Sequence, residues 1–253
     1  MSKRTIEFIR FKLKSNLKSE VSKNYLGFLW WFFEPLLLLS VFYLVFGILL
    51  NAQNEDFASY LIVGVTLWVF FSNTTNNLCG SIQSAAGVLQ QIYVPKWTFP
   101  VIFLCSHLVK FSFLLLVLVC YLIVSGYYDI SNWLQFIPVL LSYIIFVSGI
   151  GMIVASVVPT LPDLRFIVNA GVQLLMFGSG IFYQYSMIPE QYLSAFLINP
   201  IALTIYNARA TLLDGQSVAL SDSLYVALWG VVTITLSSLL LRKLDRRYPR
   251  FIL

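Results

Sequence analysis

Few residues of this sequence are suited to chemistry, and three of them fall within apolar stretches. Glu34 directly precedes Pro35 in the first stretch, and His107 and Lys110 lie in the third. Spaced three apart, His107 and Lys110 would share one face of a helix. Ionisable groups at membrane depth are costly and mark functional positions. His107 and Lys110 have no carboxylate near them in sequence, so they form no proton relay. Lys110 lies near mid-bilayer if its helix begins at Phe99, and snorkels to the interface if it begins near His107.

No enzymatic motif accompanies these residues. No lysine follows a glycine, so a GxxxxGK[ST] phosphate loop is absent, a single histidine excludes HExxH, and there is no GxSxG elbow. Cys79, Cys105 and Cys120 lack metal-type spacing and are expected to be small buried hydrophobes. The sequence therefore predicts no catalytic residue, metal or cofactor on this chain. Energy for active transport must come from an ion gradient or a partner.

The composition points to lipid as the main solvent. Of 253 residues, 59% are hydrophobic and 11% are charged, and the mean hydropathy is +0.83. A soluble domain has about a quarter of its residues charged. We therefore expect a single all-α membrane domain over residues 1–253. No secretory signal peptide is apparent, because the first 25 residues are charged and lack a continuous apolar core.

Six apolar segments are long enough to span a bilayer, which takes about 20 residues. They are residues 29–50, 60–78, 99–124, 133–157, 166–182 and 224–241, the fifth being the shortest. Seven basic residues precede the first segment and five follow the last, while the loops that would face outward carry six acidic residues and one basic residue, Arg209. The positive-inside rule then places both termini in the cytoplasm. These anchoring residues explain the net charge of +5 through contact with membrane lipids, without nucleic acid.

Three further segments have distinct patterns. Residues 3–23 carry an apolar stripe with basic residues around it, typical of an interfacial helix that either only anchors the chain or also meets a cytoplasmic partner. The loop 80–100 holds a short helical pattern at 82–92 and is either an ordinary loop or a projecting coupling helix. Residues 184–222 contain two short helices that are expected to be re-entrant or interfacial, at an outer gate.

Aromatic residues make up 16% of the chain and gather at the predicted interfaces. Aromatic belts are expected there. The same rings can also stack on sugars and line a path for a glycan.

Several motifs, in register with this topology, resemble one family. Residues 25–36 (YLGFLWWFFEPL) and 41–47 (VFYLVFG) are similar to the first-span signature of ABC-2 type permeases of polysaccharide export. Residues 93–96 (YVPK), followed by Pro100, resemble the family's YFPRxxxP, and Asn199-Pro200, Arg209 and Gly215 resemble its outer NP…R…G pattern. Asp163 and Arg165 depart from the family's adjacent Arg–Asp pair.

The resemblance implies a channel made of two copies of the chain, with each copy docking one cytoplasmic ATPase subunit that binds ATP and Mg. It implies a bacterial inner membrane and a lipid-linked polysaccharide cargo such as O-antigen, capsule or a teichoic-acid precursor. It also implies three groups of site residues: Leu89, Ile92, Tyr93, Val94, Pro95 and Lys96 for ATPase coupling, Trp30, Trp31, Glu34, Tyr43, Arg165 and Phe177 for the channel or its entrance, and Asn199, Pro200 and Arg209 for the periplasmic gate.

Three other functions remain open from the sequence. An ABC-2 exporter of small hydrophobic molecules would share the same architecture. An intramembrane transferase or hydrolase is disfavoured, because histidine and clustered carboxylates are nearly absent. A structural scaffold would tolerate mutation of the coupling segment.

Overall fold

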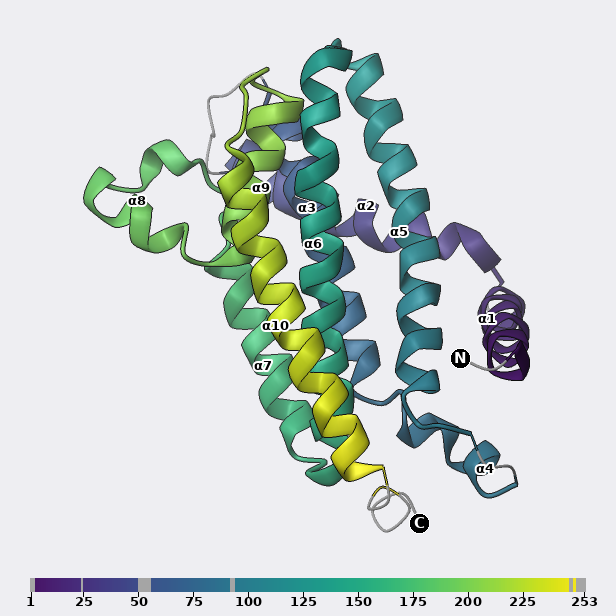
Figure 1. Ribbon diagram of the computed structural model, residues 1–253. Coiled ribbons are helices and arrows are strands. Elements are labelled where there is room, and N and C mark those ends of the chain that lie inside the picture. Colours follow the sequence, from purple (N-terminus) through teal and green to yellow (C-terminus); the bar gives the residue numbers. More distant parts are fainter. Residues whose placement is uncertain (1–2, 24, 50–55, 92–93, 246–247, 249–253) are drawn as a thin grey trace.

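The computed structural model describes residues 3–23, 25–49, 56–91, 94–245 and 248, and every regular element within them is helical (Figure 1). The longer helices are α1 (Lys3–Lys23), α2 (Trp30–Phe42), α3 (Phe57–Leu78), α5 (Thr98–Val124), α6 (Ile130–Val157), α7 (Leu164–Phe177), α9 (Pro200–Leu212) and α10 (Leu220–Leu244). The short ones are η1 (Gly27–Leu29), η2 (Tyr43–Leu49), η3 (Gln83–Ala85), α4 (Ala86–Leu89), η4 (Val158–Thr160), η5 (Tyr185–Met187) and α8 (Glu190–Phe196).

Five helical segments are long and apolar enough to cross a membrane: Gly27–Leu49, Phe57–Leu78, Thr98–Val124, Ser131–Thr160 and Leu220–Leu244. The apolar helix Leu164–Phe177 is shorter. The expected all-helical membrane fold is thus confirmed. The fifth expected segment, 166–182, ends as a helix at Phe177, because Gly178 follows and Gly180 adopts a left-handed φ of 68° that breaks the helix.

The core is built around α3, which contacts α2, α5, α6, α7 and α9. In its apolar window 72% of the residues are buried. The closest helix packing is between α6 and α10, where a Cβ added at Gly149 would lie 2.6 Å from the Gly230 carbonyl oxygen. Small residues allow two backbones to approach this closely in a membrane, where packing drives helix association.

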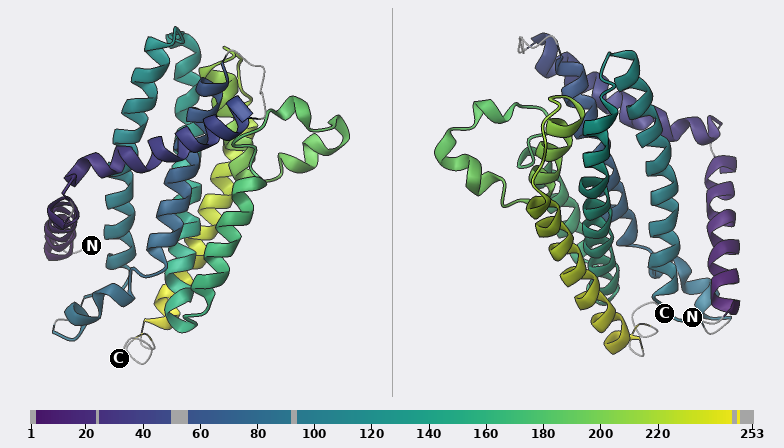
Figure 2. Two further views of the ribbon diagram at one scale, coloured as in Figure 1. Left: turned by 180° about the vertical axis from the view of Figure 1, so that it is seen from behind. Right: turned by 45° about the horizontal axis from the view of Figure 1, so that its top comes forward.

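The segment containing α2 differs from the other spans in direction and burial. Figures 1 and 2 show α2 running obliquely across α3 and α5, which themselves run along the bundle. Only 6% of the apolar window of Gly27–Leu49 is buried. Pro35 lies inside α2 and removes one backbone hydrogen-bond donor, and the π-helical η2 follows. The expected first span is therefore a helix interrupted in its regularity, with most of its apolar surface uncovered.

Figure 1 shows α1 end-on, while α5, α6 and α10 run from top to bottom. Helix α1 therefore lies across the bundle. It packs against α5. The rings of Phe8 and Phe99 meet edge to face at 6.2 Å. At the opposite side of the molecule, the segment around α8 projects away from the bundle in both figures, and α8 has no buried residue.

Candidate functional site

The segment expected to couple to an ATPase lies at the end of the bundle that also holds the C-terminus of α10 (Figure 1). Its helical part is shorter than the pattern at 82–92 predicts, since it consists of the single turns η3 and α4. Gly87 lies within α4, and glycine weakens a helix interior by about 1 kcal/mol relative to alanine. Two of the predicted coupling residues, Ile92 and Tyr93, lie outside the described residues.

Lys96 ties this segment to the last turn of α10. Its side chain is only 9% exposed, and its Nζ donates to the carbonyl oxygen of Asp245 at 2.7 Å. The carboxylate Oδ1 of Asp245 lies 3.4 Å from the same Nζ. A buried ammonium group must be compensated by hydrogen bonds and an opposite charge. Lys96 is thus a structural connection between two segments separated by 149 positions.

Two small apolar clusters flank this connection. Val94 and Phe99 are buried together with Ala85, and Phe8 of α1 and Leu89 pack against them. On the other side Tyr248 is fully buried with Ile82 and Leu241. The hydroxyl of Tyr248 donates to the carbonyl oxygen of Ser156 at 2.7 Å, and burial raises the pKa of this tyrosine, which keeps it a donor. The coupling segment is therefore fixed to α1, α6 and α10.

Three of the predicted entrance residues come together in one cavity. Trp30, Trp31 and Glu34 of α2 line a space of about 200 Å³ that faces Lys110 of α5. Lys110 forms an ion pair with Glu20 of α1, and its Nζ lies 5.7 Å from the centre of the Trp31 ring. The carboxylate that the neighbouring sequence lacks is thus supplied from 90 positions away. Lys110 is twelve residues beyond Thr98 and is neutralised rather than simply extended into water.

A second cavity of about 350 Å³ adjoins the first on the side of α1 and α4. The two share Glu20, Asn77, His107 and Lys110. The two cavities therefore meet beneath α1 at the Glu20–Lys110 ion pair. Sequence reasoning missed Glu20, because it is one of two acids on a helix in which lysine and arginine are more numerous.

The other predicted entrance residues lie elsewhere. Tyr43 stacks on Phe57 with ring centres 6.3 Å apart, and Phe177 meets Phe182 at 5.7 Å. Arg165 is exposed in the first turn of α7. Phe182 was expected to end a span. Instead it is buried against α2, with its ring centre 4.6 Å from that of Phe42 in a tilted arrangement.

The outer motif forms a second fixed connection, around Arg209. This side chain is 2% exposed and donates to three backbone carbonyls, those of Tyr60 at 3.1 Å, Gly180 at 2.7 Å and Ile181 at 2.8 Å. Its guanidinium also stacks on the Tyr60 ring at 3.3 Å. A Cβ at Gly64 would come within 2.6 Å of its Nη2, so only glycine fits beside it.

Asn199 and Pro200 complete this arrangement. The Asn199 side chain caps α9 by accepting from the Ile201 amide at 3.0 Å, and Pro200 occupies the first turn, where its missing N–H costs nothing. The Asn199 amide nitrogen also donates to the Gly178 carbonyl at 3.1 Å. Beyond α9, burial raises the pKa of Asp214, and the charge of Arg209 opposes that rise. The motif thus joins the end of α7 to α9 and α3.

In the parts of the chain that the structure describes, no three His, Cys, Asp or Glu side chains gather as metal ligands. What the described side chains build is a helical membrane domain with one segment held in place by Lys96 at one end and another held by Arg209 elsewhere in the bundle. These features define a polytopic helical membrane protein.

Comparison with known proteins places the chain more narrowly. The ABC-2 type transporter family matches residues 9–213, so the chain belongs to that family. It is 26% identical over 201 residues to the O-antigen export system permease protein RfbA of Klebsiella pneumoniae, covering 79% of this chain and 78% of the relative. It is 27% identical over 232 residues, 89% of each chain, to the polysialic acid transport protein KpsM of Escherichia coli. A Myxococcus xanthus RfbA is 24% identical over 230 residues, 88% of each.

Proposed function

We propose that two copies of this chain form the channel of an exporter that moves a lipid-linked surface polysaccharide across the bacterial inner membrane. Each copy docks a separate cytoplasmic ATPase subunit that binds ATP and Mg, and this chain binds neither. The names of the relatives, which are permeases for O-antigen and polysialic acid, support a glycan as the cargo. The remaining details of the proposal are supported by particular contacts.

The observation that carries the proposal is the rigid attachment of the coupling segment. Leu89, Val94, Pro95 and Lys96 belong to a segment that projects at the end of the bundle and is bound to α10 through Lys96 and Asp245. A segment that receives force must transmit it to a span, and α10 in turn packs closely on α6. We therefore infer that movement of the ATPase is passed through Lys96 to the pair α6–α10, with Ile92 and Tyr93 at the docking surface.

The position of α1 supports a cytoplasmic interface at this end. At 1.5 Å per residue, α5 is about 40 Å long, against about 30 Å for the hydrocarbon core. Lys110, where α1 pairs with α5, lies about 18 Å from the start of that helix. An interfacial helix sinks about 5–10 Å into the head-group boundary. Helix α1 also meets α5 at Phe99, so the first turns of α5 would lie at the interface. The helix α4 would then stand on the cytoplasmic side, as the basic residues of both termini predict.

The uncovered surface of α2 supports assembly with a second copy. Leu37 and Val41 of α2 and Leu44 of η2 are among the exposed apolar side chains of this segment, which gains little burial within one chain. Figure 2 shows α2 crossing the bundle obliquely on its outside. In the proposed dimer the residues on this surface line or border the channel, together with Tyr43, Arg165 and Phe177.

The outer segment would act as the periplasmic gate. Asn199, Pro200 and Arg209 anchor it, and the projecting helix α8, which buries no residue, is its free part. The cavity of Trp30, Trp31 and Glu34 would stand at the cytoplasmic entrance. Aromatic faces with carboxylate and amide groups suit sugar rings and hydroxyls, as the cargo requires.

Two experiments test the proposal. The tagged chain is purified from mild detergent and its companions are identified; a stoichiometric ABC ATPase subunit is expected, and a lone stable chain even after cross-linking in membranes contradicts it. In the second, the gene is deleted and surface glycan is measured. Loss of the glycan, with its lipid-linked precursor retained inside, is expected. Normal glycan with new sensitivity to hydrophobic drugs would instead favour an exporter of small molecules.

A further inference from the structure

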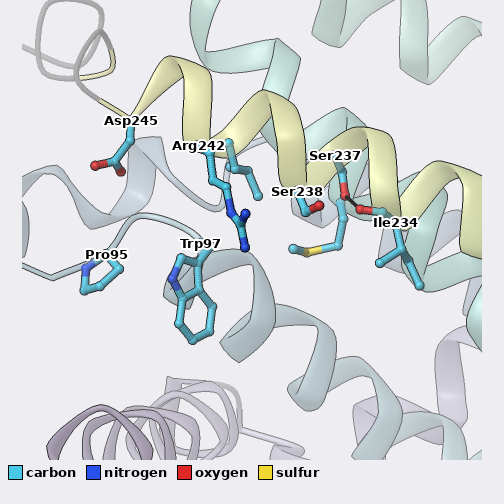
Figure 3. Close-up of a pocket in the computed structure, with 9 residues that line it drawn as sticks. Pro95, Trp97, Ile234, Ser237, Ser238, Arg242 and Asp245 are labelled. Carbon is cyan, nitrogen blue, oxygen red and sulfur yellow. Dashed lines mark hydrogen bonds between the residues drawn. The ribbon is translucent and has the colours of Figure 1, made fainter. Parts of the chain in front are cut away.

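The largest of the cavities described here, about 480 Å³, lies between the coupling segment and α10. Pro95 and Trp97 form one wall, Met152 of α6 contributes to another, and the last three turns of α10 form the third. Figure 3 shows these side chains converging on the space between the two segments. The cavity is separate from the two cavities beneath α1, with which it shares no lining residue.

The lining changes from apolar to charged along α10. Ile234 lies at one end of the cavity and Arg242 at the other, with Ser237 and Ser238 between them (Figure 3). Eight residues of helix separate Ile234 from Arg242, a rise of about 12 Å. An amphiphile that lies along α10 would place its apolar part near Ile234 and Met152 and its polar part near Arg242.

The free charge at the polar end is positive. Arg242 extends from α10 into the cavity toward Trp97 (Figure 3), and it forms no ion pair with any residue that the structure describes. The acidic side chain in the lining, Asp245, is already engaged by Lys96. A guanidinium binds phosphate oxygens in a two-pronged geometry, and tryptophan is at home at the level of lipid head groups.

The apolar end of the cavity is open to the outside of the bundle. Ile234, which lines this end, is 38% exposed. A ligand can therefore enter sideways from the lipid. The described lining offers no amide and no unengaged carboxylate for sugar hydroxyls, in contrast to the cavity near Glu34.

We propose that this cavity binds one anionic phospholipid of the surrounding leaflet. Its phosphate pairs with Arg242 beside Trp97, and the upper part of an acyl chain lies against Ile234 and Met152. Because Trp97 follows Lys96 directly, the lipid fills the seam between the coupling segment and α10. The site needs neither the export cargo nor the ATPase, so it stands or fails independently of the proposed function.

Native mass spectrometry of the purified full chain tests the site, with phosphatidylglycerol and phosphatidylcholine as probes. One retained phosphatidylglycerol per chain is expected, and the variant Arg242→Gln should bind it about fivefold more weakly, the contribution of one basic residue near a membrane surface. Lys243→Gln is the matched control. It removes the same charge at the neighbouring residue, whose side chain does not line the cavity. It should retain the lipid.

A second variant keeps every charge and fills the space. Ser238→Phe should exclude phosphatidylglycerol while leaving the melting temperature of the delipidated protein unchanged, since Ser238 is exposed and bonds only within its own helix. Equal loss in Arg242→Gln and Lys243→Gln would show diffuse attraction and overturn the site. Three other results would overturn the site as well: equal retention of phosphatidylcholine, continued binding of phosphatidylglycerol in Ser238→Phe, or retention only of lipid-linked glycan. The site would also be overturned if Arg242 were protected only by the bound ATPase.

Discussion

Arg209 and Lys96 are both cations buried in the protein, yet they hold their segments in different ways. Arg209 donates to three carbonyls from two separate segments and stacks on Tyr60. Among the described residues, Lys96 donates to the carbonyl oxygen of Asp245 and faces its carboxylate, and the Asp245 side chain is 30% exposed. The planar guanidinium fixes several groups at once, whereas the ammonium is a point charge on a flexible stem.

This difference indicates which end of the molecule can move. The Gly180 and Ile181 carbonyls lie outside regular helix and accept from Arg209, which also reaches the Tyr60 carbonyl inside α3, so the guanidinium holds that region together as one unit. The contact of Lys96 with the Asp245 carboxylate is partly exposed, so water can compete with it, while the carbonyl hydrogen bond keeps the segment attached to α10. In the proposed exporter, α9 is then a fixed support for the outer segment, and the coupling joint is where motion is transmitted.

The largest effect is expected at Arg209. Arg209→Ala should lower the free energy of unfolding by about 3 kcal/mol or more, because each buried carbonyl left without a donor costs about 1–3 kcal/mol. Thermal unfolding in detergent measures it. Arg165→Ala, which removes an exposed arginine, is the control. Gly64→Ala keeps the arginine but adds a Cβ that would press on its Nη2. This variant should therefore also destabilise the protein. Similar melting temperatures for Arg209→Ala and Arg165→Ala would break the comparison.

A smaller loss of stability but a larger loss of coupling is expected at Lys96. Lys96→Met keeps the aliphatic stem and removes the charge-assisted hydrogen bond, which contributes about 1–3 kcal/mol. Reconstituted complexes should continue to hydrolyse ATP while export per ATP falls, and Lys96→Arg should restore part of it. Lys243→Met is the matched control. A proportional fall of hydrolysis and export would show that Lys96 only supports docking. Asp245→Asn should have the weaker effect, since the carbonyl bond remains.

The sequence predicts much of this arrangement but not the partners. Hydropathy and the distribution of lysine and arginine mark the spans, and the resemblance marked Lys96, Asn199, Pro200 and Arg209 as site residues. What Arg209 does could not be read from spacing, because its acceptors are backbone carbonyls, which every residue carries. Glu20 is likewise invisible as the partner of Lys110, because 90 positions separate them and nothing local selects one acid among several bases.

The course of α2 was also beyond sequence reasoning. Its composition is that of an ordinary span, and periodicity gives no direction relative to the other helices. The packing of Phe42 and Phe46 on Phe182 decides that direction, and Phe182 itself was assigned to a helix that ends earlier. Tertiary contacts of this kind override a pattern that fits the bilayer thickness equally well in several orientations.

Tyr248 sharpens the account of the coupling joint. Tyr248→Phe removes only the hydroxyl that donates to Ser156, so the expected loss of stability is about 1 kcal/mol. The effect is read from the melting temperature, and Tyr128→Phe, at an exposed ring, is the control. Export per ATP should change less than in Lys96→Met. A greater loss of export in Tyr248→Phe would move the main connection from Lys96 to the buried tyrosine.

The smallest effect is expected at the third cation, Lys110, whose side chain is 21% exposed and whose partner Glu20 is 41% exposed. Exposed pairs contribute about 0.2–1 kcal/mol. The two single changes should nevertheless differ: Glu20→Gln leaves an unpaired ammonium inside a span, whereas Lys110→Met leaves a carboxylate that water can reach. Glu20→Gln should therefore lower the melting temperature more than Lys110→Met, and the double variant should recover part of the loss. Glu7→Gln, on the same helix, is the control. Equal effects of the two single changes would mean that Lys110 is hydrated. In that case burial would not explain the ranking of the stability effects at Arg209, Lys96 and Lys110.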